Sequence, residues 1–267
     1  MNELWTTPVH EYMSRSLISV RPDAPLSEVQ HLLDTRDVSA APVVDSSGAL
    51  VGIVSSSDLL REASLSFSGK GRVTKLSLPA RTAADVMRSE VFCVEEDQPV
   101  RVAAERMIAG RVHRLVVLRK GVPAGVLSTR DAMRAVLFHH VELPLEAVMS
   151  QPVLGVPIGA TIEQAVAELA AANVHGLAVV DGERAVGLFT HREAIQARAL
   201  PPALRALPVE GVMSYELLAL DRKTPLYRVA GHAIQTRVRR VFVTDGPQIV
   251  GLVTGYDVVR VMTLDDV

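Results

Sequence analysis

The sequence of 267 residues contains one cysteine, Cys93, which excludes an intramolecular disulfide and any metal site built from several cysteines. It is also poor in lysine: four of its 28 basic residues are lysine and the rest are arginine, whose planar guanidinium suits phosphate. A net charge of −2 argues against a general binder of nucleic acid or anionic membranes. Hydrophobic residues make up 48% and charged residues 22%, which indicates an ordinary globular protein rather than a disordered or fibrous one.

The sequence also lacks a recognisable targeting or membrane-spanning segment. Residues 1–10 have neither the basic block nor the apolar block of a signal peptide. The longest uncharged stretch near the middle, residues 147–162, is interrupted by prolines and glycines and is shorter than the roughly 20 apolar residues of a spanning helix. We therefore expect a cytoplasmic protein that binds neither membranes nor nucleic acid.

What the sequence does contain is one pattern repeated four times. Each copy opens with a short helical turn that ends in methionine and closes on Gly-x-x-Ser/Thr-x-x-Asp/Glu. The methionines are Met13, Met87, Met149 and Met213, and the glycines that begin the closing motif are Gly52, Gly125, Gly187 and Gly251. The methionine and the glycine are 39 residues apart in the first copy and 38 apart in the others, so the repeat is not a coincidence.

Each copy shows the same order of local signals. Short apolar runs, such as residues 18–20 and 91–94, predict strands, and a Pro- or Thr-led segment with helical apolar spacing follows, as in Leu26, Val29 and Leu33. Two apolar strands joined by a polar turn come next, and a second helix begins at the Ser or Thr of the closing motif. The sequence therefore predicts an α/β protein of the α+β type, with four strand-helix-strand-strand-helix repeats.

The repeat boundaries predict the domain organisation. We assign the copies to residues 1–64, 82–137, 144–199 and 208–267. Residues 65–81 are rich in Ser, Gly and Lys without an apolar period, so we interpret them as a surface loop or linker. Because a unit of about 55 residues buries little surface alone, we expect the copies to pair into two modules, residues 1–137 and 138–267.

The motifs resemble the CBS domain, named after cystathionine beta-synthase. The resemblance is carried by Met13-Ser14, by the strand Pro42-Val43-Val44-Asp45 and by the closing motif that runs from Gly52 to Leu59. It covers about residues 8–62, 82–136, 144–198 and 208–262. The resemblance implies two Bateman modules packed as a pseudo-fourfold disc, with clefts that bind adenosine-containing ligands such as AMP, ADP, ATP or S-adenosylmethionine. It also implies that such discs pair face to face, as a homodimer.

The Ser/Thr and the acid of each closing motif have two interpretations. The pairs are Ser55 with Asp58, Ser128 with Asp131, Thr190 with Glu193, and Thr254 with Asp257. Such a pair can form a capping box that closes a helix start without any ligand. The resemblance instead implies that the Asp holds a ribose and that the Ser or Thr lies near ribose or phosphate. Because capping boxes favour Glu or Gln, the three Asp residues favour the ribose hypothesis, whereas Glu193 fits the cap and departs from the family pattern.

Basic pairs mark the start of the second strand in alternate copies. The second copy has His113 and Arg114 and the fourth has Arg239 and Arg240, where the first copy has Ser39-Ala40 and the third His175-Gly176. The resemblance implies that these basic side chains point toward the phosphates of a nucleotide. The alternative is an ordinary solvated helix end, where cations favour the C-terminal dipole.

Apolar strand edges are the expected adenine pocket. By resemblance, the residues are Ile18, Pro42 and Val43 in the first copy, Phe92 and Val116 in the second, and Leu217 and Phe242 in the fourth. Simple core packing is the alternative for each of them. Pro42 alone keeps the proline of the family's strand.

The function predicted from these features is that of a regulatory sensor, not an enzyme. An adenosine nucleotide (AMP, ADP or ATP) would bind between repeats and control an unidentified partner protein through ligand-dependent conformation. Two alternatives remain: a ligand-free scaffold or oligomerisation module, and a sensor of S-adenosylmethionine or NAD(H). No nucleophile elbow, phosphate-binding loop or His-Glu-x-x-His motif indicates catalysis or a catalytic cofactor. The adjacent His139 and His140 have no third ligand at fixed spacing, so no metal site is predicted.

Overall fold

The computed structural model describes residues 5–62, 64–67, 73–172, 174, 176–198 and 200–265. The chain divides into two compact units. The larger unit comprises Met1–Thr7, Pro99–His113 and Ser128–Val267, and the smaller unit comprises Pro8–Gln98 and Arg114–Leu127. The second copy of the repeat is shared between them, because its helices belong to the larger unit and its strands to the smaller one.

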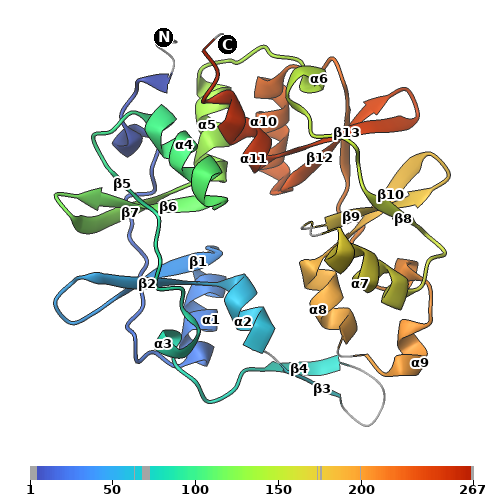
Figure 1. Cartoon of the computed structure of the whole chain (residues 1–267), viewed down its shortest axis with the longest axis horizontal. Coiled ribbons are helices and arrows are strands. Elements are labelled where there is room, and N and C mark those ends of the chain that lie inside the picture. The colour runs from blue at the N-terminus through green and yellow to red at the C-terminus, as the bar shows by residue number, and fades with distance from the viewer. Residues whose placement is uncertain are drawn as a thin grey trace. The chain divides into compact units, whose positions relative to one another are not determined.

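The smaller unit contains three small sheets (Figure 1). Strands β1 and β2 are antiparallel, β3 and β4 form an antiparallel hairpin, and β5 runs parallel to β6 in the sheet β5-β6-β7. Its elements in chain order are η2 (Val9–Glu11), α1 (Leu26–Thr35), β1 (Ala40–Val44), β2 (Leu50–Ser55), α2 (Ser56–Glu62), β3 (Ser64–Phe67), β4 (Val73–Ser77), α3 (Ala83–Val86), β5 (Cys93–Glu95), β6 (Arg114–Arg119) and β7 (Val122–Ser128), whose last residue falls in the larger unit.

The larger unit contains two sheets of three strands and most of the helices. Strand β8 runs parallel to β9, which pairs antiparallel with β10, and β11, β12 and β13 repeat this arrangement. Its elements in chain order are α4 (Val100–Gly110), α5 (Thr129–Phe138), α6 (Leu145–Val148), β8 (Gly155–Pro157), α7 (Ile162–Ala171), β9 (Gly176–Asp181), β10 (Arg184–Thr190), α8 (His191–Arg198), α9 (Pro202–Arg205), η3 (Val209–Gly211), β11 (Leu218–Asp221), α10 (Leu226–Thr236), β12 (Arg240–Asp245), β13 (Gln248–Thr254) and α11 (Gly255–Val261).

The predicted order strand-helix-strand-strand-helix is confirmed for the second, third and fourth copies. The first copy differs, because residues 18–20 form no strand and only Val20 makes a single parallel bridge, to Val43. The loop predicted for residues 65–81 is wrong in part, since β3 and β4 pair within it. Residues 68–72 of that segment lie outside the described residues.

The helical faces predicted from apolar spacing are buried. Helix α1 buries Leu26, Val29 and Leu33 in one core with Val43 and Val54 of β1 and β2. Burying such a side chain completely contributes roughly 1.5–3 kcal/mol relative to leaving it exposed. The third copy forms an equivalent core in the larger unit, from α7, β9 and β10. The first and third copies therefore pack their first helix on their own strands.

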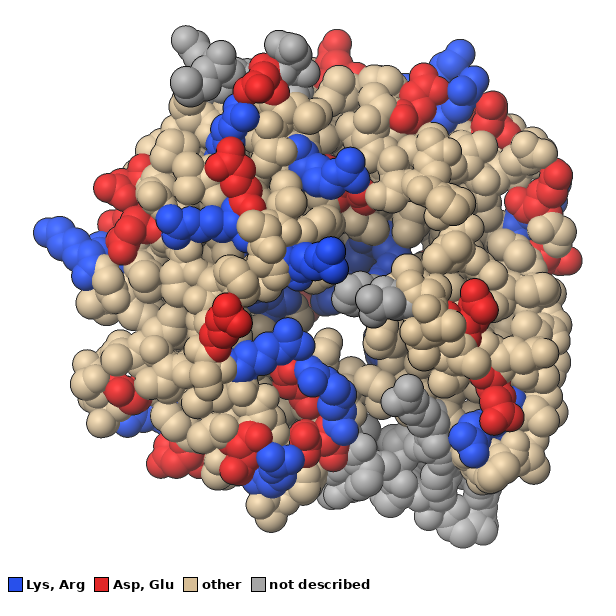
Figure 2. Space-filling model, in the orientation of Figure 1, with Lys and Arg blue, Asp and Glu red and all other residues tan. Residues whose placement is uncertain are grey.

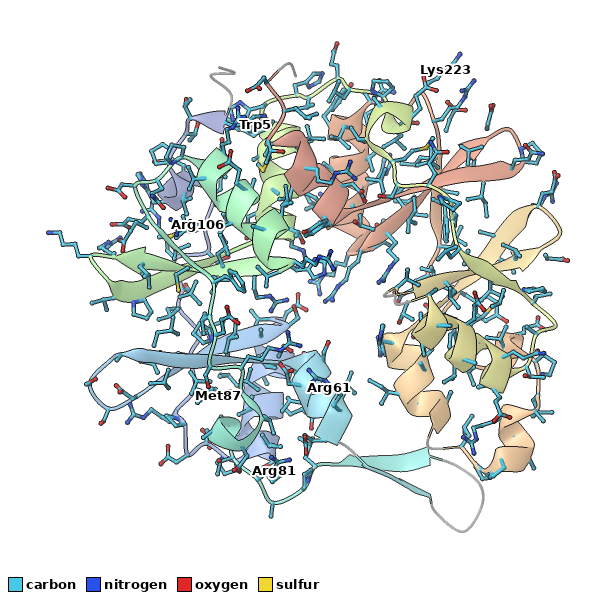
Figure 3. The ribbon with its side chains drawn as sticks, in the orientation of Figure 1. Trp5, Arg61, Arg81, Met87, Arg106 and Lys223 are labelled. Atoms are coloured by element: carbon cyan, nitrogen blue, oxygen red, sulfur yellow. The ribbon has the colours of Figure 1, made fainter. Side chains whose placement is uncertain are left out.

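The methionine turns join the copies in pairs. A Cβ added at Gly52 would lie 2.5 Å from Met87 Sδ, and one added at Gly125 would lie 2.5 Å from the carbonyl oxygen of Ser14. Thus the turn of the second copy packs on the first copy, and the turn of the first copy packs on the second (Met87 is labelled beside β2 in Figure 3). The third and fourth copies exchange their turns in the same way, Met213 at Gly187 and Met149 at Gly251.

Helices of the second copy also pack on helices of the fourth, within the larger unit. Helix α5 lies against α10 and α11 (Figure 1). A Cβ added at Gly255 would lie 2.7 Å from Thr129 Cβ, so the starts of α11 and α5 approach as closely as a glycine permits. The Tyr256 hydroxyl donates to the carbonyl oxygen of Ile108 at 2.9 Å, at the end of α4. These contacts fix the position of α4 and α5 within this unit.

Within the described part of the chain, no helix combines the length and the apolar character needed to cross a membrane.

Candidate functional site

The acid of each closing motif is buried at the start of a helix. Asp58, Asp131, Glu193 and Asp257 are between 2% and 8% exposed. In every copy the backbone N–H of the preceding Ser or Thr donates to one carboxylate oxygen, at 2.8–2.9 Å. The neighbouring hydroxyl donates to the same oxygen in all four copies. One oxygen of each carboxylate therefore closes the helix start, as a capping box does.

The premise that a capping box favours Glu over Asp does not hold in this protein, and the ribose role of the three Asp residues stays a prediction. Thr82 and Asp85 form a complete capping box at α3, with Thr82 N–H donating to Asp85 Oδ2 at 2.7 Å, outside any closing motif. Glu193 makes the same cap as the three Asp residues. Either acid reaches the backbone N–H in this protein, so the cap alone does not select the side-chain length.

The second carboxylate oxygen has a further partner in the first, second and fourth copies. Asp131 Oδ1 accepts from Arg134 at 2.7 Å, and Asp58 Oδ1 accepts from Arg61. Asp257 Oδ1 accepts from the Ser150 hydroxyl at 2.6 Å, and Arg260 lies 3.6 Å from it. These arginines were not predicted as site residues, although the spacing Asp-x-x-Arg recurs in three copies. Gln196 replaces the arginine in the third copy.

A second arginine approaches Asp58 from the neighbouring copy. Arg88 follows Met87 in the methionine turn of the second copy, and its Nε lies 3.6 Å from Asp58 Oδ1. Its backbone pairs with Ile53 on β2, which holds the turn beside the first copy. The matching residue of the third copy is Ser150, the donor to Asp257. The residue after the methionine thus reaches the acid of the paired copy in both units.

Arg114, at the start of β6, reaches the first copy. Its guanidinium donates to the Ser39 hydroxyl at 2.8 Å. The Ser39 carbonyl accepts from Ser56 N–H at 3.0 Å, and Ala40 pairs with Ser55 across β1 and β2. A cation of the second copy therefore lies at the strand ends that carry the Ser55 and Asp58 pair.

Arg240 takes the corresponding place between the fourth and third copies. A Cβ added at Gly176 would lie 3.4 Å from Arg240 Cζ and 3.2 Å from Thr190 Cγ2, so the guanidinium lies across the start of β9. Burial, reinforced by the adjacent charge of Arg239, lowers the pKa of Arg240, and the Glu193 carboxylate opposes this shift. Arg239 itself is exposed.

His113 lies beside the fourth copy, within the larger unit. Its ring is exposed and meets the Tyr256 ring edge-on, with the centroids 5.8 Å apart. Its carbonyl accepts from Thr129 N–H at 3.0 Å. His113 and Arg114 are adjacent in sequence, yet the first contacts the residue before Asp257 and the second contacts Ser39.

The residues predicted for the adenine pocket divide by burial. Val43, Val116 and Phe242 are at most 1% exposed, and Phe242 packs with Ala178 and Leu188 in a core that Leu217 partly covers. Pro42 is also buried, and its carbonyl accepts from Val20 N–H at 3.0 Å. Core packing therefore describes these four residues. The partly exposed Ile18, Phe92 and Leu217 keep a surface that a ligand could reach.

Other features of the described residues lie apart from these groups. They include no group of three or more His, Cys, Asp or Glu side chains that could hold a metal ion. A surface hollow of about 430 Å³ in the smaller unit is lined by Arg15, Arg119, Val122, Pro123 and Ala124. None of the predicted site residues lines it.

The arrangement of the copies agrees with one known family. The sequence matches the CBS domain at residues 9–65, 83–138, 145–200 and 209–264. The chain belongs to the CBS domain family. The four copies are CBS repeats, and the family predicted from the methionine turns and closing motifs is confirmed.

Curated relatives match parts of this chain in sequence. An A-adding tRNA nucleotidyltransferase of Geobacter sulfurreducens is 35% identical over 115 residues, which are 43% of this chain and 13% of that protein. An inosine-5'-monophosphate dehydrogenase of Methanocaldococcus jannaschii is 30% identical over 125 residues, 46% of this chain and 22% of that protein. The chain therefore spans less than a quarter of the length of these two curated relatives.

A solved structure matches nearly the whole chain. Protein MJ1225 of Methanocaldococcus jannaschii superposes with a TM-score of 0.74 at 16% identity, over 96% of this chain and 99% of that one. This similarity shows a shared fold of CBS repeats.

Proposed function

We propose that this protein is a regulatory sensor that binds an adenosine nucleotide, AMP, ADP or ATP, between paired CBS repeats. The observation that carries the proposal is the position of Arg114, a cation of the second repeat that donates to Ser39 where the Ser55 and Asp58 pair of the first repeat lies. Family membership supports the ligand class, since paired CBS domains often bind adenosine-containing ligands. Most basic residues of the chain are arginines, whose guanidinium groups are suitable phosphate ligands.

The chemistry of the proposed site follows from its donors and acceptors. The carboxylate oxygen that does not cap the helix can accept from the vicinal hydroxyls of a ribose. Guanidinium groups bind phosphate with charge-assisted hydrogen bonds, which contribute roughly 1.5–3 kcal/mol each. Ile18 and Phe92, both partly exposed, offer apolar contact to a base. Binding would control a partner protein if the ligand favours one conformation over another.

Ligand-dependent thermal melts test the proposal directly. The full chain is melted alone and with AMP, ADP, ATP, NADH or S-adenosylmethionine. A ligand present at 100 times its dissociation constant should stabilise the protein by about 2.7 kcal/mol. Stabilisation by an adenine nucleotide supports the proposal. Stabilisation by S-adenosylmethionine or NADH alone would show that the protein senses that molecule and not AMP, ADP or ATP. Unchanged melting across the panel would contradict ligand sensing.

Asp257→Glu tests the ribose role of the carboxylate. Glu193 makes the same cap at the matching position, so the glutamate should keep the helix start closed while moving the second oxygen. We expect nucleotide affinity, measured by calorimetry, to fall while the melting temperature without ligand is kept. Glu193→Asp is the matched control, because it shortens the acid in the third repeat. Unchanged affinity in Asp257→Glu and in the equivalent Asp131→Glu would remove the ribose assignment.

A ligand-free scaffold is the alternative that a specific observation favours. Both oxygens of Asp58, Asp131 and Asp257 already have partners within the chain. A scaffold needs no further partner for these groups, and it would join copies of the chain, as a homodimer, or another protein. The melting panel separates the two proposals, because only the sensor is stabilised by nucleotide.

A further inference from the structure

The acids of the first and fourth repeats face unequal amounts of positive charge. We define the Asp58 cluster as Asp58 with Arg61, Arg88 and Arg114, and the Asp257 cluster as Asp257 with Arg260 and Ser150. Both contain one buried carboxylate with a capped oxygen. They differ in the groups brought by the paired repeat, and this difference is a basis for discriminating ligands by charge.

Two guanidinium groups meet one carboxylate oxygen in the Asp58 cluster. Arg61 projects from α2 (Figure 3) and donates to Asp58 Oδ1, and Arg88 Nε lies 3.6 Å from the same oxygen. Their side chains are 58% and 65% exposed, so each can turn toward a ligand. Glu62, the next acid along α2, is paired with Arg81. One carboxylate charge thus faces two mobile cations.

The third arginine of the Asp58 cluster comes from the start of β6. Arg114 donates a hydrogen bond to the Ser39 hydroxyl. The Ser39 carbonyl oxygen accepts a hydrogen bond from the backbone N–H of Ser56, the first residue of α2. Arg61, Arg88 and Arg114 therefore come from three separate elements and converge on the region where α2 begins. Figure 2 shows basic side chains beside one another over the region of α2.

The Asp257 cluster lacks two of these charges. Ser150 stands at the position of Arg88 and donates a neutral hydroxyl to Asp257 Oδ1 at 2.6 Å. Gly176 stands at the position of Arg114 and has no side chain to contribute, but the exposed Arg239 stands at the position of Ser39. Arg260, 3.6 Å from Asp257 Oδ1, balances one carboxylate with one cation. The two clusters share their backbone contacts and differ in net charge.

We infer that the Asp58 cluster favours adenosine ligands with two or three phosphates, and that it does so more strongly than the Asp257 cluster. The inference rests on the proposed function, since it concerns the same ligands. A ribose that donates to Asp58 Oδ1 replaces Arg61 and Arg88 there, and the released guanidinium groups then meet the phosphates. Arg88 gives the first cluster a cation for phosphate where the second has the neutral Ser150, whereas Arg114 of the first cluster is matched in charge by Arg239, at the strand start beside Thr254.

A reciprocal exchange of Arg88 and Ser150 tests the inference. Serine follows the methionine in the other three repeats, so Arg88→Ser places a residue that this backbone position already accepts. Adenosine, AMP, ADP and ATP are titrated calorimetrically into the full chain. Asp58→Asn and Asp257→Asn identify which binding step belongs to each cluster. Arg184→Ser, an exposed change outside both clusters, controls for the loss of one surface charge.

In the Asp58 step, Arg88→Ser should weaken ATP binding about tenfold and adenosine binding less than about twofold. Ser150→Arg should strengthen ATP binding in the Asp257 step. Equal changes for adenosine and ATP in both exchange variants would overturn the inference while leaving nucleotide binding intact. Absence of any nucleotide binding to the wild-type chain would overturn the proposed function, and that result is seen before any variant is made.

Discussion

The second and fourth CBS repeats each begin a strand with an arginine that reaches the paired repeat, yet the two arginines meet different surroundings. Arg114 donates to the Ser39 hydroxyl, whereas Arg240 lies across Gly176 and its pKa is lowered by burial. The backbone position is the same in both repeats. The environment of each guanidinium group is therefore determined by the facing repeat and not by the repeat that carries the arginine.

These two repeats differ elsewhere as well, and each difference can be tested by a pair of substitutions. The aromatic ring of the predicted adenine pocket stands at Phe92 in the second repeat, before a strand, and at Phe242 in the fourth, inside a strand. Only Phe242 is fully enclosed.

Phe242→Ala should produce the largest loss of stability. It removes a ring that is 1% exposed and packed with Ala178 and Leu188, and such a cavity costs about 3–5 kcal/mol. Phe92→Ala should cost clearly less, because Phe92 is partly exposed, and should instead weaken nucleotide binding. Urea unfolding and calorimetry measure the two effects. Equal destabilisation by both changes would contradict the difference in burial.

Gly125→Ala should rank second, with a loss of about 1–3 kcal/mol. The new Cβ would lie 2.5 Å from the Ser14 carbonyl oxygen, which is backbone and cannot turn aside. The matching Gly251→Ala should cost less, because the added methyl meets the flexible side chain of Met149. Gly159→Ala is the control, since no atom lies within 4 Å of its added Cβ. Chemical unfolding measures the loss of stability in each of the three variants. A different order of these losses would contradict the close packing of the methionine turns.

Removing the hydroxyl of the helix start should cost about 1 kcal/mol in either repeat. Thr254→Ala should cost somewhat more than Ser128→Ala, because Thr254 Oγ1 also accepts from Tyr256 N–H at 3.2 Å. Thr161→Ala removes an equivalent cap from α7, outside the proposed sites. We expect all three to lower the melting temperature, but only the first two to weaken nucleotide binding. A loss of affinity in Thr161→Ala would show that stability alone controls binding.

The smallest effect concerns pH. His139, after α5, meets the Trp5 ring edge-on at 5.5 Å, and burial lowers the pKa of His139. A base with a lowered pKa in the folded state stabilises the protein above its unfolded pKa and loses this contribution as pH falls through the folded value. Melts between pH 7.5 and 5 should therefore show a larger loss for the wild type than for His139→Phe. His232→Asn, at an exposed position of α10, should follow the wild type.

The fold could be predicted because its determinants are local and repeated. Methionine turns and closing glycines recur at a constant separation, since each methionine must meet a glycine of the paired repeat. Residues 18–20 carry the same apolar signal as residues 91–94, but only one bridge forms there. The hairpin of β3 and β4 was missed, although Ser64-Leu65-Ser66-Phe67 alternates polar and apolar residues as a strand does.

The candidate site could be predicted only in part. The acids and hydroxyls were visible because they lie three residues apart on one helix start. Arg61 was also visible in principle, three residues after Asp58, where a helix brings side chains together. Arg88 was not, because it reaches Asp58 across a contact between two repeats, and no spacing within one repeat encodes that approach.

The packing of α5 against α10 and α11 has a consequence for any attempt to study half of this chain. A fragment ending near residue 140 would carry α5 without the two helices that pack on it, and the complementary fragment would carry α10 and α11 without α5. Each half would therefore lose helix packing that the whole chain has, even though four similar repeats suggest that the protein could be divided at its centre.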